Sequence, residues 1–340
     1  MSHSKPNNNK PQPSAPSAQG LNLNARVEGG QKQLVYLPEP KNFQFGIAPE
    51  YQPDYTIGVF GSRGTGKSWL IRDLVFDMRP YFPCVYVFTK TKINKWYETF
   101  CNTEYIFDVT ERGMEWSLWK LKQIFADQEG KVAAWREGVN INPYILIIYD
   151  DCIDIKQKYN QEFLDQYYIG RHFCIGSIWA GQHYYAAAKG GRANMDYIFS
   201  MMQEQEGQME GLWKEAMGKR IPYDVFAKLI DTYTVDQQFL CWDIRDKTGP
   251  ITERVYKGKA RDPGIFLVGC ELYWSTNLAG ADKIISGRAR EEAERKMDWQ
   301  KWFPFQMSNL SIVNDDGHGG LSHKRRLARG FVELREARQS

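Results

Sequence analysis

Short apolar runs alternate along the middle of the chain with longer segments in which apolar residues recur every three or four positions. The short runs are typical of strands buried on both faces, and the longer segments of amphipathic helices. Their alternation predicts an α/β fold with a mostly parallel sheet and helices on both faces. The predicted strands cover residues 55–60, 84–89, 144–149, 174–180, 197–201, 238–242 and 265–268.

One glycine-rich turn joins the first predicted strand to a predicted helix. It reads GSRGTGKS and has the spacing of a loop that binds phosphates. In this interpretation backbone N–H groups surround the phosphates, Lys67 contacts the β- and γ-phosphates, and Ser68 holds Mg²⁺. A glycine-rich turn without a ligand is the less favoured alternative. The predicted ligands are therefore ATP and Mg²⁺, and the predicted nucleotide-binding residues are Gly61, Ser62, Arg63, Gly64, Thr65, Gly66, Lys67 and Ser68.

Two carboxylates follow the predicted strand at 144–149. Asp150 and Asp151 stand at its carboxyl end, where ligands bind in open α/β sheets. We assign Asp150 to the Mg²⁺ ligands and Asp151 to polarising the attacking water, because hydrolysis needs an acceptor within hydrogen-bond reach of the nucleophile. The alternative is a strand-end turn with two solvated aspartates.

Three more polar residues are candidates for contact with the γ-phosphate. Gln182 ends the strand predicted at 174–180, and its amide could gain or lose a hydrogen bond on hydrolysis. In one large group of nucleotide hydrolases such a strand lies between the phosphate-loop strand and the acidic strand. Charge on the transferred phosphoryl group also requires a cation, often from a neighbouring subunit, and Arg171 and Arg192 are candidates. A loop glutamine and two solvated arginines are the alternatives.

Amino-acid composition argues against several classes of protein but does not identify the function. The net charge of +3 is too small to indicate a nucleic-acid partner. Six cysteines without a C-x-x-C pair favour reduced core thiols of a cytosolic-type protein over disulfides or a zinc site. The absence of an apolar leader and of a run of eighteen apolar residues predicts no secretion signal and no membrane span.

With GSRGTGKS, YILIIYDDC and RHFCIGSIWAGQHYYAAAKGGRANMDYIF in this order, the chain resembles the genome-packaging ATPases of poxviruses and other large or membrane-containing DNA viruses. These belong to the FtsK–HerA superfamily. The resemblance covers roughly residues 55–201 and is weaker to about residue 274. It implies a RecA-like P-loop NTPase fold, a homomeric ring, ATP hydrolysis with Mg²⁺, and translocation of double-stranded DNA into a preformed capsid.

The same resemblance implies capsid proteins as partners and a location in the virion and at the reducing, cytoplasmic-type site of viral assembly in the host cell. Many relatives have Glu as the second acid where this chain has Asp151, and a shorter carboxylate requires a closer water. By this resemblance, the residues that correspond to functional residues of the family are Lys67, Ser68, Asp150, Asp151 and Gln182. A basic-x-Asn element of the family matches Arg192 and Asn194.

We expect three parts in the chain: a disordered arm over residues 1–42, a P-loop ATPase domain over 43–274, and a charged helix with a basic tail over 275–340. The basic loop at 89–97 and a terminal cluster are candidates for DNA contact, and solvated charge is the favoured explanation of each. Two other functions stay open. One is a P-loop kinase with residues 286–296 as an arginine lid, and the other is a nucleotide-binding virion protein without turnover. The terminal cluster comprises Lys324, Arg325, Arg326 and Arg329.

Overall fold

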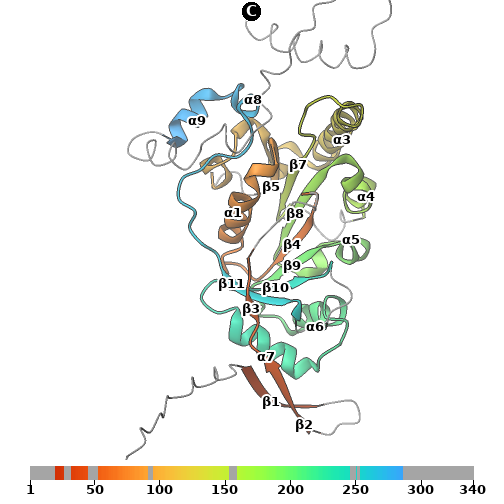
Figure 1. The fold of residues 1–340 in the computed structure, drawn as a ribbon, viewed down its shortest axis with the longest axis vertical. Coiled ribbons are helices and arrows are strands. Elements are labelled where there is room, and N and C mark those ends of the chain that lie inside the picture. Colours follow the sequence, from red (N-terminus) through yellow and green to blue (C-terminus); the bar gives the residue numbers. More distant parts are fainter. Residues whose placement is uncertain are drawn as a thin grey trace, which may run out of the picture.

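The computed structural model describes residues 20–26, 32–44, 53–90, 95–152, 159–245, 250 and 253–285. Its main element is a nine-stranded sheet (Figure 1). The strands are β3 (Lys41–Asn42), β4 (Thr56–Phe60), β5 (Cys84–Thr89), β6 (Ile106–Asp108), β7 (Ile145–Asp150), β8 (Ile175–Gly181), β9 (Tyr197–Ser200), β10 (Gln238–Asp243) and β11 (Val255–Lys259). Their order in the sheet is β3-β11-β10-β9-β4-β8-β7-β5-β6.

The sheet is parallel in its centre and antiparallel toward one side. From β9 to β6 every neighbouring pair of strands is parallel, whereas β10 runs antiparallel to both β9 and β11. β8 lies between β4 and β7, so the extra strand between the phosphate-loop strand and the acidic strand is confirmed. The predicted antiparallel additions after the parallel core are also confirmed.

Helices cover both faces of this sheet (Figure 1). Side chains of α1 and α8 pack on one face, and side chains of α3, α4, α6 and α7 pack on the other. The helices are α1 (Lys67–Met78), α2 (Val109–Arg112), α3 (Met114–Arg136), α4 (Gln161–Ile169), α5 (Lys189–Ala193), α6 (Glu206–Glu215), α7 (Tyr223–Tyr233), α8 (Glu271–Trp274) and α9 (Leu278–Ile285).

The central strands divide their side chains between two apolar cores. In β7, Leu146 and Ile148 point into the core beneath α1, while Ile147 and Tyr149 point into the core beneath α3 and α4. Successive side chains of a strand alternate between faces, and both faces are covered here. This is why the strand reads as a continuous apolar run instead of an alternating one.

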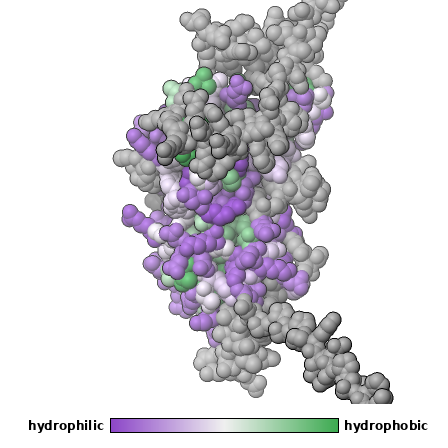
Figure 2. Space-filling model, turned by 60° about the vertical axis from the view of Figure 1, so that its left-hand side comes forward, coloured by the Kyte–Doolittle hydropathy of each residue, from purple (hydrophilic) through white to green (hydrophobic). Residues whose placement is uncertain are grey.

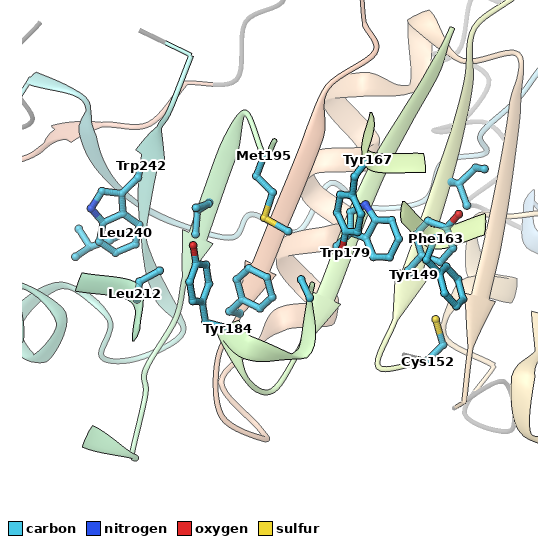
Figure 3. Packing of buried hydrophobic residues seen from close by; sticks show 14 of the residues in the cluster. Tyr149, Cys152, Phe163, Tyr167, Trp179, Tyr184, Met195, Leu212, Leu240 and Trp242 are labelled. Atoms are coloured by element: carbon cyan, nitrogen blue, oxygen red, sulfur yellow. The ribbon is translucent and has the colours of Figure 1, made fainter. Parts of the chain in front are cut away.

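A column of stacked aromatic rings supports the carboxyl end of the central strands (Figure 3). Tyr149 of β7 and Trp179 of β8 stack with ring centroids 4.0 Å apart, and Tyr167 of α4 stacks on the other face of Trp179 at the same distance. Phe88 of β5 extends the column, 5.5 Å from Tyr149. Tyr149 directly precedes Asp150, so this packing fixes the spacing of β7 and β8 where the site residues begin.

Two parts of the fold differ from the sequence-based expectation. Within the segment 1–42, expected to be disordered, β1 (Gly20–Arg26) pairs antiparallel with β2 (Lys32–Pro38), β3 joins the main sheet, and β1 lies beside α7. The expected strand at 265–268 is irregular buried chain, although Phe266 and Val268 are in the core. A short apolar run indicates burial but not conformation.

The remaining expectations for the chain ends stay predictions, because residues 286–340 lie outside the described residues. These include the charged helix, the arginine lid and the terminal basic cluster.

On the face drawn in Figure 2, coloured side chains are mainly hydrophilic with small hydrophobic patches. In the described part of the chain, no helix combines the length and apolarity needed to cross a bilayer.

Candidate nucleotide-binding site

The glycine-rich segment after β4 folds as a tight loop that leads into α1. Gly64 and Gly66 have φ angles of 81° and 98°, in the region that favours glycine. A β-carbon at Gly61 would come within 2.8 Å of the side chain of Met201, so the loop needs glycine there for space as well. Within the loop, the hydroxyl of Thr65 donates a hydrogen bond to the carbonyl of Ser62 over 2.8 Å. The segment therefore has the arrangement of strand, tight glycine loop and helix that is typical of a phosphate-binding loop.

Lys67 lies folded against its own loop. Its side chain is buried, and its ammonium group donates hydrogen bonds to the carbonyl oxygens of Gly61 at 2.8 Å and Ser62 at 3.1 Å. Burial lowers the pKa of Lys67, while the nearby charges of Asp151 and Asp150 act to raise it. The structure thus brings the lysine close enough to both acids for their charges to act on it.

Asp150 is the last residue of β7 and is buried. Burial raises the pKa of Asp150 to about 6, with a further increase from the charge of Asp151, while Tyr97 and Lys67 oppose the shift. A carboxylate so placed fits a divalent cation, because the cation's charge would offset the cost of burial. Ser68, partly exposed at the start of α1, offers a second oxygen of the kind that Mg²⁺ prefers.

The raised pKa of Asp150 gives a prediction for stability. Between about pH 4 and pH 6 the native state binds the proton that the unfolded state releases, so the contribution of this group to stability falls as pH rises. We expect Asp150→Asn to raise the free energy of unfolding of the ligand-free protein by about 3 kcal/mol at pH 7, and to have little effect at pH 4. Urea denaturation at both pH values measures this. Asp231→Asn, at an exposed position of α7, is the control, and equal stabilisation at pH 4 would contradict the assigned cause.

Asp151 stands where the chain leaves the sheet. Its φ angle is +49°, an uncommon value for a residue other than glycine, although Asp tolerates it better than most. Its N–H donates a hydrogen bond to the carbonyl of Ala180 over 3.0 Å, which ties the turn to β8. The second acid is thus held by backbone geometry next to the first.

The strand register brings the site residues to one edge of the sheet. Phe60 of β4 pairs with Gly181 of β8, and Ala180 pairs with Asp150 of β7, so the three strands end in line. The N–H of Gly61 donates to the carbonyl of Gly181 over 3.3 Å. Gln182 follows directly and is exposed. The structure therefore places Lys67, Asp150, Asp151 and Gln182 around the end of β8.

Arg192 does not point freely toward a phosphate. Its side chain is buried and forms two hydrogen bonds with the carboxylate of Glu215, at 2.6 and 2.9 Å, and one with the carbonyl of Ala187 at 2.5 Å. Its guanidinium group also lies over the rings of Tyr184 and Tyr185. The geometry is that of a structural clamp between α5, α6 and the loop after Gln182.

We therefore expect Arg192→Ala to lower the free energy of unfolding by about 2–4 kcal/mol, because it leaves the Glu215 carboxylate without its bidentate partner. Urea denaturation measures the change. Arg220→Ala, which removes an exposed arginine, is expected to have little effect. An Arg192→Ala protein of unchanged stability but lost activity would instead favour the catalytic role.

Arg171 lies at the opposite edge of the sheet from the phosphate loop. It stands before β8, exposed, and its guanidinium group pairs with the carboxylate of Asp196 at 2.5 Å. Asp196 in turn accepts a hydrogen bond from the N–H of Thr56, at the start of β4. The structure thus does not bring Arg171 to the site of its own chain.

Asn194, the other residue of the basic-x-Asn element, lies at the end of α5. Its side-chain amide donates a hydrogen bond to the carbonyl of Gly190.

Two aromatic residues at the site were missed in the sequence. The side chain of Tyr97 is buried beside Asp150, and the indole N–H of Trp96 donates to the carbonyl of Ser68 over 3.2 Å. Both lie at the end of the basic loop at 89–97, named above as a candidate for DNA contact, of which residues 91–94 lie outside the described part. No spacing rule links them to the phosphate loop, so the sequence carried no signal for this contact.

Strand order and site together define the class. A sheet in which β8 separates the phosphate-loop strand from the acidic strand, with the acids and the loop at one edge, is that of a RecA-like P-loop NTPase. The family model described as the Poxvirus A32 protein matches residues 44–221, more than half of the chain, and the chain belongs to this family. The resemblance to genome-packaging ATPases of large DNA viruses is thereby confirmed.

Curated relatives come from large DNA viruses. The chain is 27 % identical over 213 residues to the uncharacterized protein L437 of Acanthamoeba polyphaga mimivirus, covering 62 % of this chain and 74 % of that protein. It is 26 % identical over 227 residues to the uncharacterized protein 075L of Invertebrate iridescent virus 6, covering 64 % and 82 %.

Among solved structures, the genome packaging NTPase B204 of Sulfolobus turreted icosahedral virus 2, in complex with AMPPCP, matches with a TM-score of 0.42 and 16 % identity. That match covers 62 % of this chain and 100 % of B204. The pCW3 conjugation coupling protein TcpA, with ATPgS, matches with a TM-score of 0.42 and 11 % identity, over 67 % of this chain and 62 % of TcpA.

Proposed function

We propose that this protein hydrolyses ATP and uses the released free energy to move double-stranded DNA into a preformed viral capsid. The observation that carries the proposal is the alignment of three strand ends. It sets the phosphate loop, the two acids and Gln182 at one edge of the sheet. Membership of the Poxvirus A32 family supports the packaging role.

The proposed reaction uses the groups of this edge in defined roles. Backbone N–H groups of the loop and the start of α1 bind the phosphates, and Lys67 exchanges its two carbonyl partners for phosphate oxygens. Mg²⁺ held by Ser68 and Asp150 would supply positive charge at the phosphates when bound. Water attacks the γ-phosphorus, its proton passes to Asp151, and the bond to the bridging oxygen breaks so that ADP leaves with the electron pair.

Gln182 is proposed to report the state of the γ-phosphate. Its backbone follows β8 directly, and the loop beyond it is held to α6 through the pair of Arg192 and Glu215. A hydrogen bond gained with ATP and lost with ADP would therefore act on a chain segment that is fixed at its other end. A change at the γ-phosphate would thereby be transmitted through this loop to α6.

A homomeric ring and capsid proteins are the proposed partners, and the virion and the host-cell site of assembly the proposed location. In such a ring Arg171 is the better candidate for a cation supplied to a neighbouring subunit, because it is exposed, whereas Arg192 is clamped inside its own chain. Mixing Arg171→Ala with wild-type protein tests this role. A loss of activity steeper than simple dilution would support it, and proportional dilution would oppose it.

The test of the proposed function is ATP hydrolysis by the purified chain with and without duplex DNA. We expect hydrolysis without DNA and a several-fold increase with DNA, with the increase falling as salt is raised, because contacts to phosphates release counterions. Duplexes of different sequence should stimulate equally. Hydrolysis that is indifferent to DNA would refute the translocase, and binding of ATP without turnover would refute the enzyme.

A further inference from the structure

The phosphate loop has two distinct flanks. On one flank Lys67 interacts with Asp150 and Asp151, so the γ-phosphate end of a nucleotide belongs there. On the other flank Gly66 faces Gln237, whose side-chain atoms lie 3.2 Å from the place that a β-carbon of Gly66 would take. A triphosphate whose γ end meets the lysine and the acids leaves its nucleoside on the side away from them. That side is formed by β9, β10 and the turn before β10.

The turn before β10 has an unusual backbone for its sequence. The N–H of Gln238 donates to the carbonyl of Val235 over 2.9 Å, and the two residues between them, Asp236 and Gln237, have φ angles of 50° and 62°. Two successive positive φ angles define a type I′ turn, which favours Asn-Gly. Neither central residue here is Asn or Gly. The turn thus keeps the Gln237 side chain beside the phosphate loop at a conformational cost.

Antiparallel pairing brings a second segment to the same place. Leu240 of β10 pairs with Ser200 of β9, and the two strands run antiparallel. The turn that precedes β10 and the residues that follow β9 therefore lie at the same edge of the sheet. Met202 is fixed there because its carbonyl accepts a hydrogen bond from the N–H of Ser62 over 3.0 Å. Met202 and Val235 are 45 % and 39 % exposed, so both leave apolar atoms accessible to a ligand.

We propose that Met202, Val235, Asp236 and Gln237, here named the turn surface, contact the nucleoside of the bound nucleotide. This inference rests on the proposed ATP site and adds its base-binding side. Met202 and Val235 offer apolar atoms to a flat base, and the Gln237 amide can both donate to and accept from the polar edge of a base. Asp236 offers an acceptor for ribose hydroxyl groups.

A variant that keeps the turn, removes the Gln237 side chain and neutralises Asp236 tests the inference. Asp236→Asn combined with Gln237→Gly places the favoured residues of a type I′ turn, so the backbone is expected to stay folded. Calorimetric titration with Mg²⁺ compares ATP with inorganic tripolyphosphate, which has the phosphates but no nucleoside. The matched control is Lys219→Gly, which changes another exposed residue of positive φ in a turn after α6.

We expect the double variant to bind ATP about tenfold more weakly and tripolyphosphate as wild type does, with Met202→Ala showing a smaller loss of the same kind. Unchanged ATP affinity in both variants would overturn the inference, as would an equal loss for both ligands, which would indicate a damaged phosphate loop. A wild-type protein that binds neither ligand would instead refute the proposed nucleotide site. The two failures are therefore distinguishable.

Discussion

Lys67→Ala is expected to reduce ATP hydrolysis by at least about a hundredfold, the loss typical for removal of one charged group that stabilises the transition state. The ammonium group is buried in the loop, held by two carbonyl oxygens and close to two acids, so it is preorganised for the phosphate oxygens. No other cation in the described part of the loop can replace it, because Arg63 is exposed at the tip. Steady-state ATPase assays measure the change.

The control for this experiment is Lys228→Ala, which removes an exposed lysine from α7 and should leave turnover unchanged. Circular dichroism shows whether the Lys67 variant is folded. A folded Lys67→Ala protein with full turnover would remove the loop from the mechanism. It would then leave the fold without its proposed enzymatic function.

Asp151→Asn is expected to lower the turnover number by about 10²–10⁴-fold while nucleotide affinity changes little, because only the acceptor of the water's proton is lost. Asn tolerates the positive φ of this position as well as Asp does, so the backbone turn should persist. The loss would therefore report chemistry and not a change of conformation. Single-turnover assays and nucleotide titration separate the two quantities.

Asp151→Glu supplies a second comparison, since the resemblance noted in the sequence implies Glu as the usual second acid. We expect this variant to keep measurable turnover, because it retains a carboxylate, and Asp231→Asn on the exposed face of α7 to behave as wild type. If Asp151→Asn hydrolysed ATP at the wild-type rate, another group would have to accept the proton. Asp150 would not be the first choice, because it is assigned to the metal.

The local rules of the sequence were sufficient to locate the central strands and the phosphate loop along the chain. A buried strand, a glycine-rich loop and a helix with apolar spacing identify β4, the phosphate loop and α1, and the acids at 150 and 151 identify the end of β7. The position of β8 between them followed from the resemblance and is now seen in the register. These features depend on residues close in sequence, which is why they could be predicted.

Contacts between distant segments could not be predicted in the same way. Arg192 was assigned to phosphate, but its partner Glu215 is 23 residues further on, and no spacing rule marks the pair. Tyr97 beside Asp150 and Gln237 beside Gly66 are pairs even further apart in the sequence. β11 was missed because its sequence, VYKGK, is short and half polar, as expected of a strand near the side of a sheet.

The two outer strands of the main sheet are very short: β3 has two residues and β6 has three. So few unpaired backbone groups cannot support continued pairing with a second molecule. In the proposed ring, neighbouring copies of the protein are therefore expected to meet through helices and loops and not by extending one sheet from subunit to subunit. Subunits joined in this way can rotate against each other during a cycle without breaking a shared ladder of backbone hydrogen bonds.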